Sequence, residues 1–367
     1  MMDMMSLSPK PGIMEIEAYV PGRSEAAGAA RVFKMSSNES PFGPSPKAVA
    51  AYEQAEPSLG IYPEGTARIL REAVAAHFGL AADRIVCGNG SDEILTLLAN
   101  AYVQPGDEVL FSAHAFSLYR IVTLANSGIP IEVPTPDLKL NVDDAIARIN
   151  RKTRLVYIAN PNNPTASYVS ASEMRRLHRA LPESALLVID AAYAEYVRRN
   201  DFEAGIELVS TSNNAVMTRT FSKAYGLAGI RVGWAYCPKD VADVLNRVRA
   251  PFNVNIAAQH AAVAALEDVP YTDNVVRHNE SWRAWLIEQI RELGLRVDDS
   301  VANFVLIHFP EKAGCRASDA DRFLMAKGII MRGCGSYDLP QCLRLTVGSE
   351  EANRAAIASL REFMSSR

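Results

Sequence analysis

The middle of the chain alternates short apolar segments with segments of helical periodicity, and this alternation limits the fold more than any other feature. Continuous apolar strands separated by helices are typical of a sheet buried on both faces. Helical patterns such as residues 91–103 and 170–181 lie between the apolar runs. The pattern predicts an α/β fold with a mainly parallel sheet. The expected strands cover residues 84–88, 107–112, 129–134, 154–160, 185–190 and 214–220.

Serines stand where two of these helices are expected to begin. Ser91 is followed by Asp92 and Glu93, which predicts a capping serine and two acidic residues in a first turn. Ser170 and Ser172 precede the next helical pattern in the same way. The first of these helix starts comes directly after the expected strand 84–88.

The texture of the sequence changes after Pro251, where an α+β pattern replaces the regular alternation. The segments 255–268, 281–294, 317–328 and 350–366 read as helices, and 302–309, 328–333 and 342–348 read as strands. The first 30 residues show no periodic element. We therefore expect three parts: an N-terminal arm that joins the small domain (1–32), a large domain (33–250) and a small C-terminal domain (251–367).

The composition excludes several classes of protein. The 367 residues are 49% hydrophobic and carry a net charge of −4, so no bulk basic character indicates nucleic-acid binding. No apolar run reaches the roughly 18 residues that a membrane-spanning helix needs, and the N-terminus lacks a signal-peptide pattern. Five scattered cysteines without a CxxC pair are typical of reduced thiols. We expect a cytoplasmic protein with neither nucleic-acid nor membrane partners.

Several catalytic and binding motifs are absent. The segment GNGSDE (88–93) begins like a dinucleotide fingerprint, but Glu93 stands where the third glycine is required. The chain has no GxxxxGK[ST], HExxH or GxSxG sequence. Its six histidines show no metal-ligand spacing, so no metal site is expected.

Unusual polar segments follow the expected strands. NPNNPT (160–165), DAAYAEY (190–196) and TFSKAYGLAGIRVGW (220–234) each come directly after an apolar run. Ligands of open α/β sheets bind at the carboxyl ends of the strands. The candidate groups all follow strands and are expected to share one site: Ser91, Asp92, Asn163, Asp190, Lys223 and Arg231.

Each candidate has an ordinary alternative when it is taken singly. Asp190 could cap a turn, Lys223 could be a solvated amine, and residues 160–165 could form a simple turn. Together they have a chemical logic. A buried lysine forms Schiff bases with carbonyls, an aspartate can keep a pyridinium nitrogen protonated, and a helix N-terminus with serine and arginine binds phosphate. This combination describes a site for pyridoxal 5'-phosphate.

The sequence resembles the fold-type I pyridoxal-phosphate aminotransferases, and within them the histidinol-phosphate aminotransferases. The resemblance runs from about Tyr19 to the C-terminus. It implies a large domain with a mainly parallel mixed sheet and a smaller α+β domain. Its ordered motifs are AYVPG, SSNESPFGPSP, YPEG, GNGSDEIL, NPNNPT, DAAYAEY, TFSKAYGLAGIRVGW and CLRLTVG.

The resemblance implies a role for each cofactor residue. Lys223 would be the Schiff-base lysine and the proton-transfer base, and Asp190 would pair with the pyridine nitrogen. Tyr193 and Asn163 would bind the ring oxygen, and Phe116 would stack on the ring. The phosphate would be held by Ser91, Asp92, Ser222 and Arg231, and by Tyr62 of the neighbouring subunit of a homodimer.

The resemblance also implies how the substrate is held. Arg344 would bind its anionic group, and Arg332 would add a second cation for a phosphate, although an arginine there could instead form a surface ion pair. Asn163 and Tyr19 would complete the pocket. Two departures from the family pattern are Phe116 in place of tyrosine and Ala166 in place of glycine. Because alanine is not freely left-handed, the turn at Ala166 is expected to avoid that conformation.

The implied reaction is a ping-pong amino transfer in histidine biosynthesis. Histidinol phosphate and 2-oxoglutarate would give imidazole-acetol phosphate and glutamate. An aromatic amino-acid aminotransferase is the nearest alternative, because a pocket that admits imidazole also admits phenyl. A pyridoxal-phosphate enzyme that does not transaminate, such as a decarboxylase, is the alternative from a different class.

Overall fold

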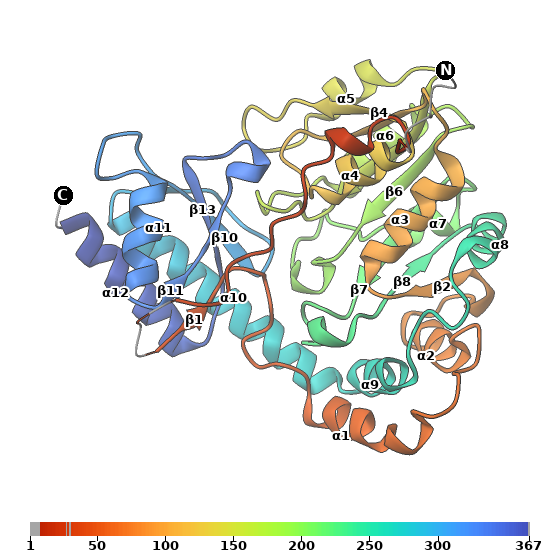
Figure 1. The fold of residues 1–367 in the computed structure, drawn as a ribbon, viewed down its shortest axis with the longest axis horizontal. Helices are drawn as coiled ribbons and strands as arrows, with labels where there is room; N and C mark the ends of the chain where they lie inside the picture. Colours follow the sequence, from red (N-terminus) through yellow and green to blue (C-terminus); the bar gives the residue numbers. More distant parts are fainter. Residues whose placement is uncertain (1–7, 27, 29–30, 366–367) are drawn as a thin grey trace, which may run out of the picture.

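The computed structural model describes residues 8–26, 28 and 31–365, so part of the predicted arm (residues 1–7, 27 and 29–30) lies outside the described residues. Its main feature is a seven-stranded sheet in the order β2-β8-β7-β6-β5-β3-β4 (Figure 1). All the neighbouring strands are parallel except the two pairs that β8 forms. The strands are β2 (Ile85–Gly88), β3 (Glu108–Ser112), β4 (Ile129–Val133), β5 (Thr153–Ala159), β6 (Leu186–Asp190), β7 (Ala215–Thr220) and β8 (Gly233–Tyr236).

Helices cover both faces of this sheet, as its buried central strands require. One face packs against α3 (Ser91–Tyr102), α4 (Leu118–Ala125) and α8 (Lys239–Val248). The other face packs against α2 (Arg68–Phe78), α5 (Val142–Arg148), α6 (Ala171–Arg179), α7 (Ile206–Ser210) and α9 (Ile256–Glu267), with α1 (Pro46–Gln54) outside α9. The predicted α/β class is confirmed.

A second unit is built on an antiparallel sheet of order β12-β13-β10-β9, with a two-stranded pair β1-β11 beside it. Its core also contains α11 (Ala317–Ala326), α12 (Glu350–Ser365) and the end of α10 (Val269–Glu292). Its strands are β1 (Phe33–Lys34), β9 (Arg296–Val297), β10 (Phe304–His308), β11 (Ile329–Ile330), β12 (Arg332–Gly333) and β13 (Cys342–Thr346).

The units meet in a different place from the one expected. The sequence boundary at residue 251 precedes α9, yet buried α9 side chains such as Ala258 and Ala262 lie in the core of the large sheet. The 24-residue α10 runs from beside α9 into the second unit (Figure 1). At the other end, Met35 belongs to the second core because β1 pairs with β11. Helical periodicity does not show which core receives a helix.

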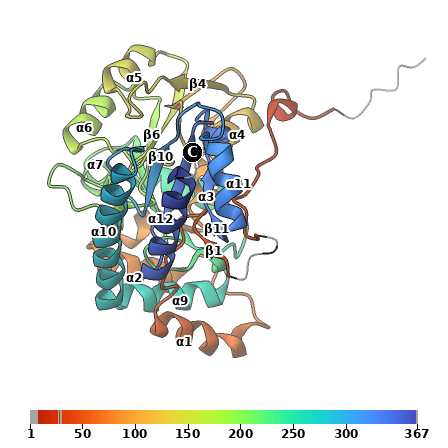
Figure 2. The same cartoon turned by 90° about the vertical axis from the view of Figure 1, so that its left-hand side faces the viewer.

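The N-terminal segment lies along the outside of the large sheet unit. A 3₁₀ turn of this segment (Ile13–Glu15) contacts α4, and Figure 2 shows it at the side of the molecule next to that helix. Before it reaches α1, the chain contributes β1 to the second unit. None of the described helices is long and apolar enough to cross a membrane.

Two local predictions are wrong. Ser91 is the first residue of α3 and makes no capping hydrogen bond; the cap is Gly90, with φ of 80°. This backbone conformation is strained for any residue with a side chain, so it favours glycine at position 90. Ala166 has φ of 58° although it is not glycine. It is buried, and its N–H donates to Asn162 O at 2.9 Å, so its surroundings impose the left-handed conformation. By contrast, Ser170 caps α6 as predicted.

Gly233 supplies a test of the contact between β8 and the start of α3. A Cβ at Gly233 would lie 2.6 Å from Ser91 N, 2.7 Å from Gly90 C and 2.8 Å from Arg219 O, which are all backbone atoms. We expect Gly233→Ala to lower the free energy of unfolding by about 2 kcal/mol, measured by thermal unfolding without cofactor. Gly229→Ala is the control, because its Cβ would meet no described atom within 4 Å. Equal melting temperatures for Gly233→Ala and the wild type would contradict the tight contact.

Candidate active site

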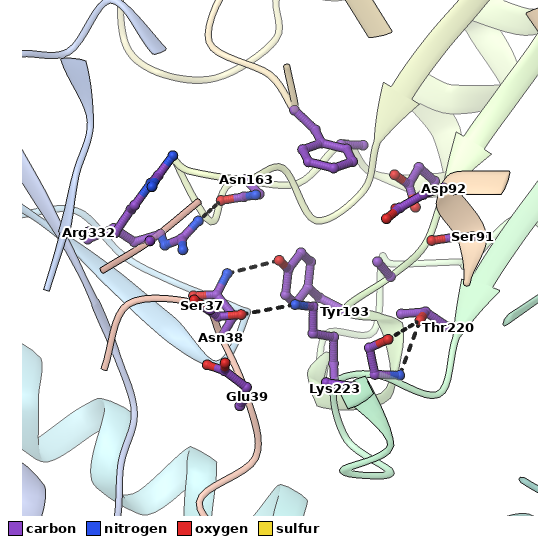
Figure 3. A pocket seen from close by; sticks show the side chains of 18 of the residues that line it. Ser37, Asn38, Glu39, Ser91, Asp92, Asn163, Tyr193, Thr220, Lys223 and Arg332 are labelled. Carbon is purple, nitrogen blue, oxygen red and sulfur yellow. Dashed lines mark hydrogen bonds between the residues drawn. The ribbon is translucent and has the colours of Figure 1, made fainter. Parts of the chain in front are cut away.

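A pocket of about 260 Å³ lies at the carboxyl ends of β5, β6 and β7, where the second unit meets the large sheet. Figure 3 shows Lys223 and Tyr193 of the large unit facing Ser37 and Asn38. All the predicted site residues except Tyr62 line this pocket: Tyr19, Ser91, Asp92, Phe116, Asn163, Asp190, Tyr193, Ser222, Lys223, Arg231, Arg332 and Arg344. Their roles remain predictions, whereas their shared location in this pocket is observed.

The first turn of α3 and the loop after β7 form a cradle suited to an anion. Arg231 Nη1 donates to Ser222 Oγ at 3.2 Å, and Nη2 donates to Asp92 Oδ2 at 3.2 Å. The amide N–H groups at the start of α3 have no partner within the helix and carry its positive dipole end. Arg231 has φ of 56°, a left-handed conformation that is uncommon outside glycine. Such strain is concentrated at functional sites.

Asp190 is the last residue of β6 and is 6% exposed. Its Oδ2 accepts from Tyr119 OH at 2.8 Å and its Oδ1 from Thr218 Oγ1 at 3.3 Å. Burial raises the pKa of Asp190 to about 6, and these two hydrogen bonds oppose the rise. No described residue forms an ion pair with it. A buried carboxylate of this kind fits a cationic ring N–H as its partner.

Lys223 follows β7 and points into the pocket (Figure 3). Its Nζ donates to Ser37 O at 3.2 Å. Burial lowers the pKa of Lys223 to about 8; Arg344 adds to this effect, whereas Glu39 opposes it. An amine with such a pKa is readily deprotonated near neutral pH, so it can act as a nucleophile or as a proton-transfer base.

Two arginines enter the pocket from neighbouring strands of the second unit. Arg332 of β12 and Arg344 of β13 are paired across the sheet. Arg344 is 4% exposed and donates to Asn163 Oδ1 and, at 2.6 Å, to Ser36 O. Arg332 donates to Val20 O of the N-terminal segment at 2.8 Å. Two guanidinium groups that line one pocket are suited to a divalent anion.

Comparison with known proteins agrees with this geometry. The family model described as "Aminotransferase class I and II" matches residues 30–360. The chain belongs to the class I and II aminotransferases. A protein of Rhodopseudomonas palustris (strain HaA2) named histidinol-phosphate aminotransferase is 52% identical over 357 residues, which are 97% of this chain and 98% of the relative. The strain BisB5 protein of that name is 51% identical over the same shares.

Solved structures of aminotransferases share the fold. The histidinol-phosphate aminotransferase of Sinorhizobium meliloti, solved in complex with pyridoxal-5'-phosphate, has a TM-score of 0.86 and 30% identity over 92% of each chain. The aspartate aminotransferase of Thermotoga maritima has a TM-score of 0.80 and 21% identity, covering 91% of this chain and 92% of that one. This second likeness concerns the fold alone.

Residues that sequence reasoning missed complete this aminotransferase site. Asn38, Glu39 and Tyr337 line the pocket, and Tyr119 lies behind Asp190. Asn38 and Glu39 belong to the motif SSNESPFGPSP, but the sequence predicts no role for either residue. Tyr119 had a usable signal, because a tyrosine on the apolar face of a helix needs a hydrogen-bond partner for its hydroxyl.

Removal of the Tyr119 hydroxyl tests the environment of Asp190. We expect Tyr119→Phe to raise the pKa of Asp190 by about one further unit. Carbon NMR of the carboxyl group in the cofactor-free protein measures this pKa. Tyr157→Phe is the control: Tyr157 stacks on Tyr119 at 4.8 Å but donates to Leu95 O.

The same change has a predicted effect on stability. Because folding raises the pKa of Asp190 from 3.8 to about 6, its contribution to the free energy of unfolding is lost as the pH rises through that range. In Tyr119→Phe the loss should extend to higher pH. An unchanged titration of Asp190 would contradict the assigned hydrogen bond.

Proposed function

We propose that the chain transfers an amino group between histidinol phosphate and 2-oxoglutarate, giving imidazole-acetol phosphate and glutamate, with pyridoxal 5'-phosphate as cofactor. The observation that supports this substrate is the cross-strand pair of Arg332 and Arg344, both of which line the pocket. A phosphate dianion can use two guanidinium groups, whereas a carboxylate needs only one. The names of the R. palustris and S. meliloti proteins support the same substrate.

The chain's own residues fit the cofactor. When bound, pyridoxal phosphate supplies an electron sink for charge that develops on the substrate carbon. The α3 start, Ser222 and Arg231 would hold its phosphate, and Asp190 would hold the ring N–H. Lys223, with its lowered pKa, would carry the proton to and from the reacting carbon. Tyr193 and Asn163 would bind the ring oxygen, with Phe116 against the ring.

The substrate would lie between the cofactor residues and the second unit. Arg344 and Arg332 would bind its phosphate, and Tyr19 would cover the entrance from the N-terminal segment. Arg332 already holds this segment through Val20 O. The bound anion and the covering segment would therefore share one guanidinium group. The five cysteines are free and buried, which is in keeping with a cytoplasmic location.

Substitution of Arg332 tests the substrate assignment. We expect Arg332→Gln to lower kcat/KM for histidinol phosphate by about 10- to 100-fold, because one charged hydrogen-bond partner is lost. The value for phenylalanine, which has no phosphate, should change by less than about threefold. Steady-state kinetics with both donors measures the difference. Arg296→Gln is the control, since Arg296 is exposed and pairs with Asp298 away from the pocket.

The wild-type kinetics decide between substrates. Faster turnover of phenylalanine than of histidinol phosphate, by tenfold or more, would overturn the proposed substrate in favour of an aromatic amino-acid aminotransferase. Equal losses for both donors in Arg332→Gln would remove the assigned role of Arg332.

We also propose that the active unit is a homodimer in which Tyr62 reaches the partner's cofactor phosphate. Tyr62 is 80% exposed, stacks on Phe252 at 4.7 Å, and does not line the pocket of its own chain. Leu59 and Ile61 beside it are also largely exposed. Contiguous exposed apolar side chains are typical of interaction surfaces.

Removal of the Tyr62 hydroxyl tests this arrangement. We expect Tyr62→Phe to remain dimeric in analytical ultracentrifugation and to raise the Kd for pyridoxal phosphate about tenfold. The ring stays in place, so only the hydrogen bond to the phosphate is lost. Tyr52→Phe, at another exposed tyrosine, is the control and should change neither value. A monomeric wild-type protein would contradict the proposal.

A further inference from the structure

The segment between β1 and α1 contacts the site through three consecutive residues. Ser36 O accepts from Arg344 Nη2 at 2.6 Å, Ser37 O accepts from Lys223 Nζ at 3.2 Å, and Asn38 Nδ2 donates to Tyr193 OH at 2.9 Å. Two of these bonds, at Ser37 and Asn38, are drawn in Figure 3. The first two residues use backbone atoms, which any residue could supply. Asn38 alone uses its side chain, so its chemistry is the specific feature of the segment.

Thr346 forms two hydrogen bonds with Asn38, one of them to its amide oxygen. Thr346 Oγ1 accepts the backbone N–H of Asn38 at 3.0 Å and donates its own hydrogen to Asn38 Oδ1 at 3.1 Å. A hydroxyl has one hydrogen, and it is used in this bond. With Oδ1 turned to Thr346, the Nδ2 group must face Tyr193.

The direction of that contact fixes the Tyr193 hydroxyl. An amide NH₂ group can only donate, so the phenol oxygen of Tyr193 accepts. The single phenol hydrogen is then left to point away from Asn38. Tyr193 is buried and lines the pocket, so the direction open to this hydrogen is the pocket itself. The hydrogen bonds of Thr346, Asn38 and Tyr193 therefore all run in one direction.

This arrangement is held in place by its surroundings. Asn38 is 1% exposed and has φ of 60°, a left-handed conformation that asparagine tolerates better than most residues. Its carbonyl accepts from Asn303 Nδ2 at 3.0 Å. Thr346 and Asn303 belong to the second unit and Tyr193 to the large one, so Asn38 joins the two units at the site.

We propose that Asn38 is a positioning residue that makes Tyr193 a hydrogen-bond donor toward the ring oxygen of the cofactor, with Thr346 setting its direction. The inference rests on the proposed function, because that function supplies the acceptor in the pocket. A donor aimed at this oxygen stabilises negative charge on it. Asn38 touches neither cofactor nor substrate in this scheme and acts only through Tyr193.

Asn38→Asp reverses the direction with almost no change in shape. A carboxylate accepts, so the Tyr193 hydrogen would turn toward position 38 and leave the pocket. Aspartate also tolerates the left-handed conformation. We expect the Kd of the cofactor-free enzyme for pyridoxal phosphate to rise about tenfold. The pH midpoint of the visible absorption change of the loaded enzyme should rise by about one unit.

Thr346→Val removes the hydroxyl without adding a charge. The amide of Asn38 is then free to flip. The Kd for pyridoxal phosphate and the pH midpoint of the absorption change should therefore both rise, but by less than in Asn38→Asp. Thr346→Ser keeps the hydroxyl and should retain the wild-type values. This pair separates the direction of the hydrogen bonds from the charge that Asn38→Asp introduces, and it carries the test if Asn38→Asp does not fold.

A double-mutant cycle with Tyr193→Phe decides whether Asn38 acts through Tyr193. In the Tyr193→Phe background, Asn38→Asp should change the Kd for pyridoxal phosphate by less than about twofold. It should shift the pH midpoint by less than about 0.3 unit. The same full effect in both backgrounds would overturn the proposal, as would Thr346→Val with wild-type values. A wild-type protein that binds no pyridoxal phosphate would instead overturn the proposed function.

Discussion

Removal of three charged groups from bulk water is the condition on which the site depends. The Asp190 carboxylate and the Arg344 guanidinium are buried where the two units meet, and Lys223 is half-buried beside them. Desolvation disfavours the charged form, which lowers the pKa of Lys223 and raises that of Asp190. Neither sheet alone could achieve this burial, because the strand ends of the large sheet would face solvent. The second unit therefore contributes two arginines and also excludes water from the charged groups of the site.

Much of this site could be predicted from residue order alone. The rule that ligands bind at the carboxyl ends of parallel strands is enough to place Asn163, Asp190 and Lys223 at one edge of the sheet. Each of them follows a run of apolar residues that is expected to form a buried strand. The arginines of the second unit came only from the family resemblance, since the sequence gives no register between β12 and β13. Once paired, Arg332 and Arg344 are neighbours.

The features that were missed depend on contacts between distant segments. Tyr119 meets Asp190 across 71 residues, and Asn38 meets Thr346 across 308. No local pattern encodes such pairs. The boundary near residue 251 was misplaced for a related reason: α9 is apolar on most sides, and only packing decides which core receives it. The left-handed Ala166 is likewise imposed by its neighbours against its own preference.

The antiparallel strand β8 has a consequence for how the site can vary. Because β8 begins at the edge where β7 ends, the connecting residues 221–232 stay at that edge and need no crossover helix. Ser222, Lys223 and Arg231 therefore lie on one short connection of fixed length. A residue inserted there would displace the amine from the anion cradle. Among the other loops of the large sheet that carry site residues, those with Phe116 and Asn163 lead into the helices α4 and α6. This connection is therefore the part of the site least able to tolerate a change in length.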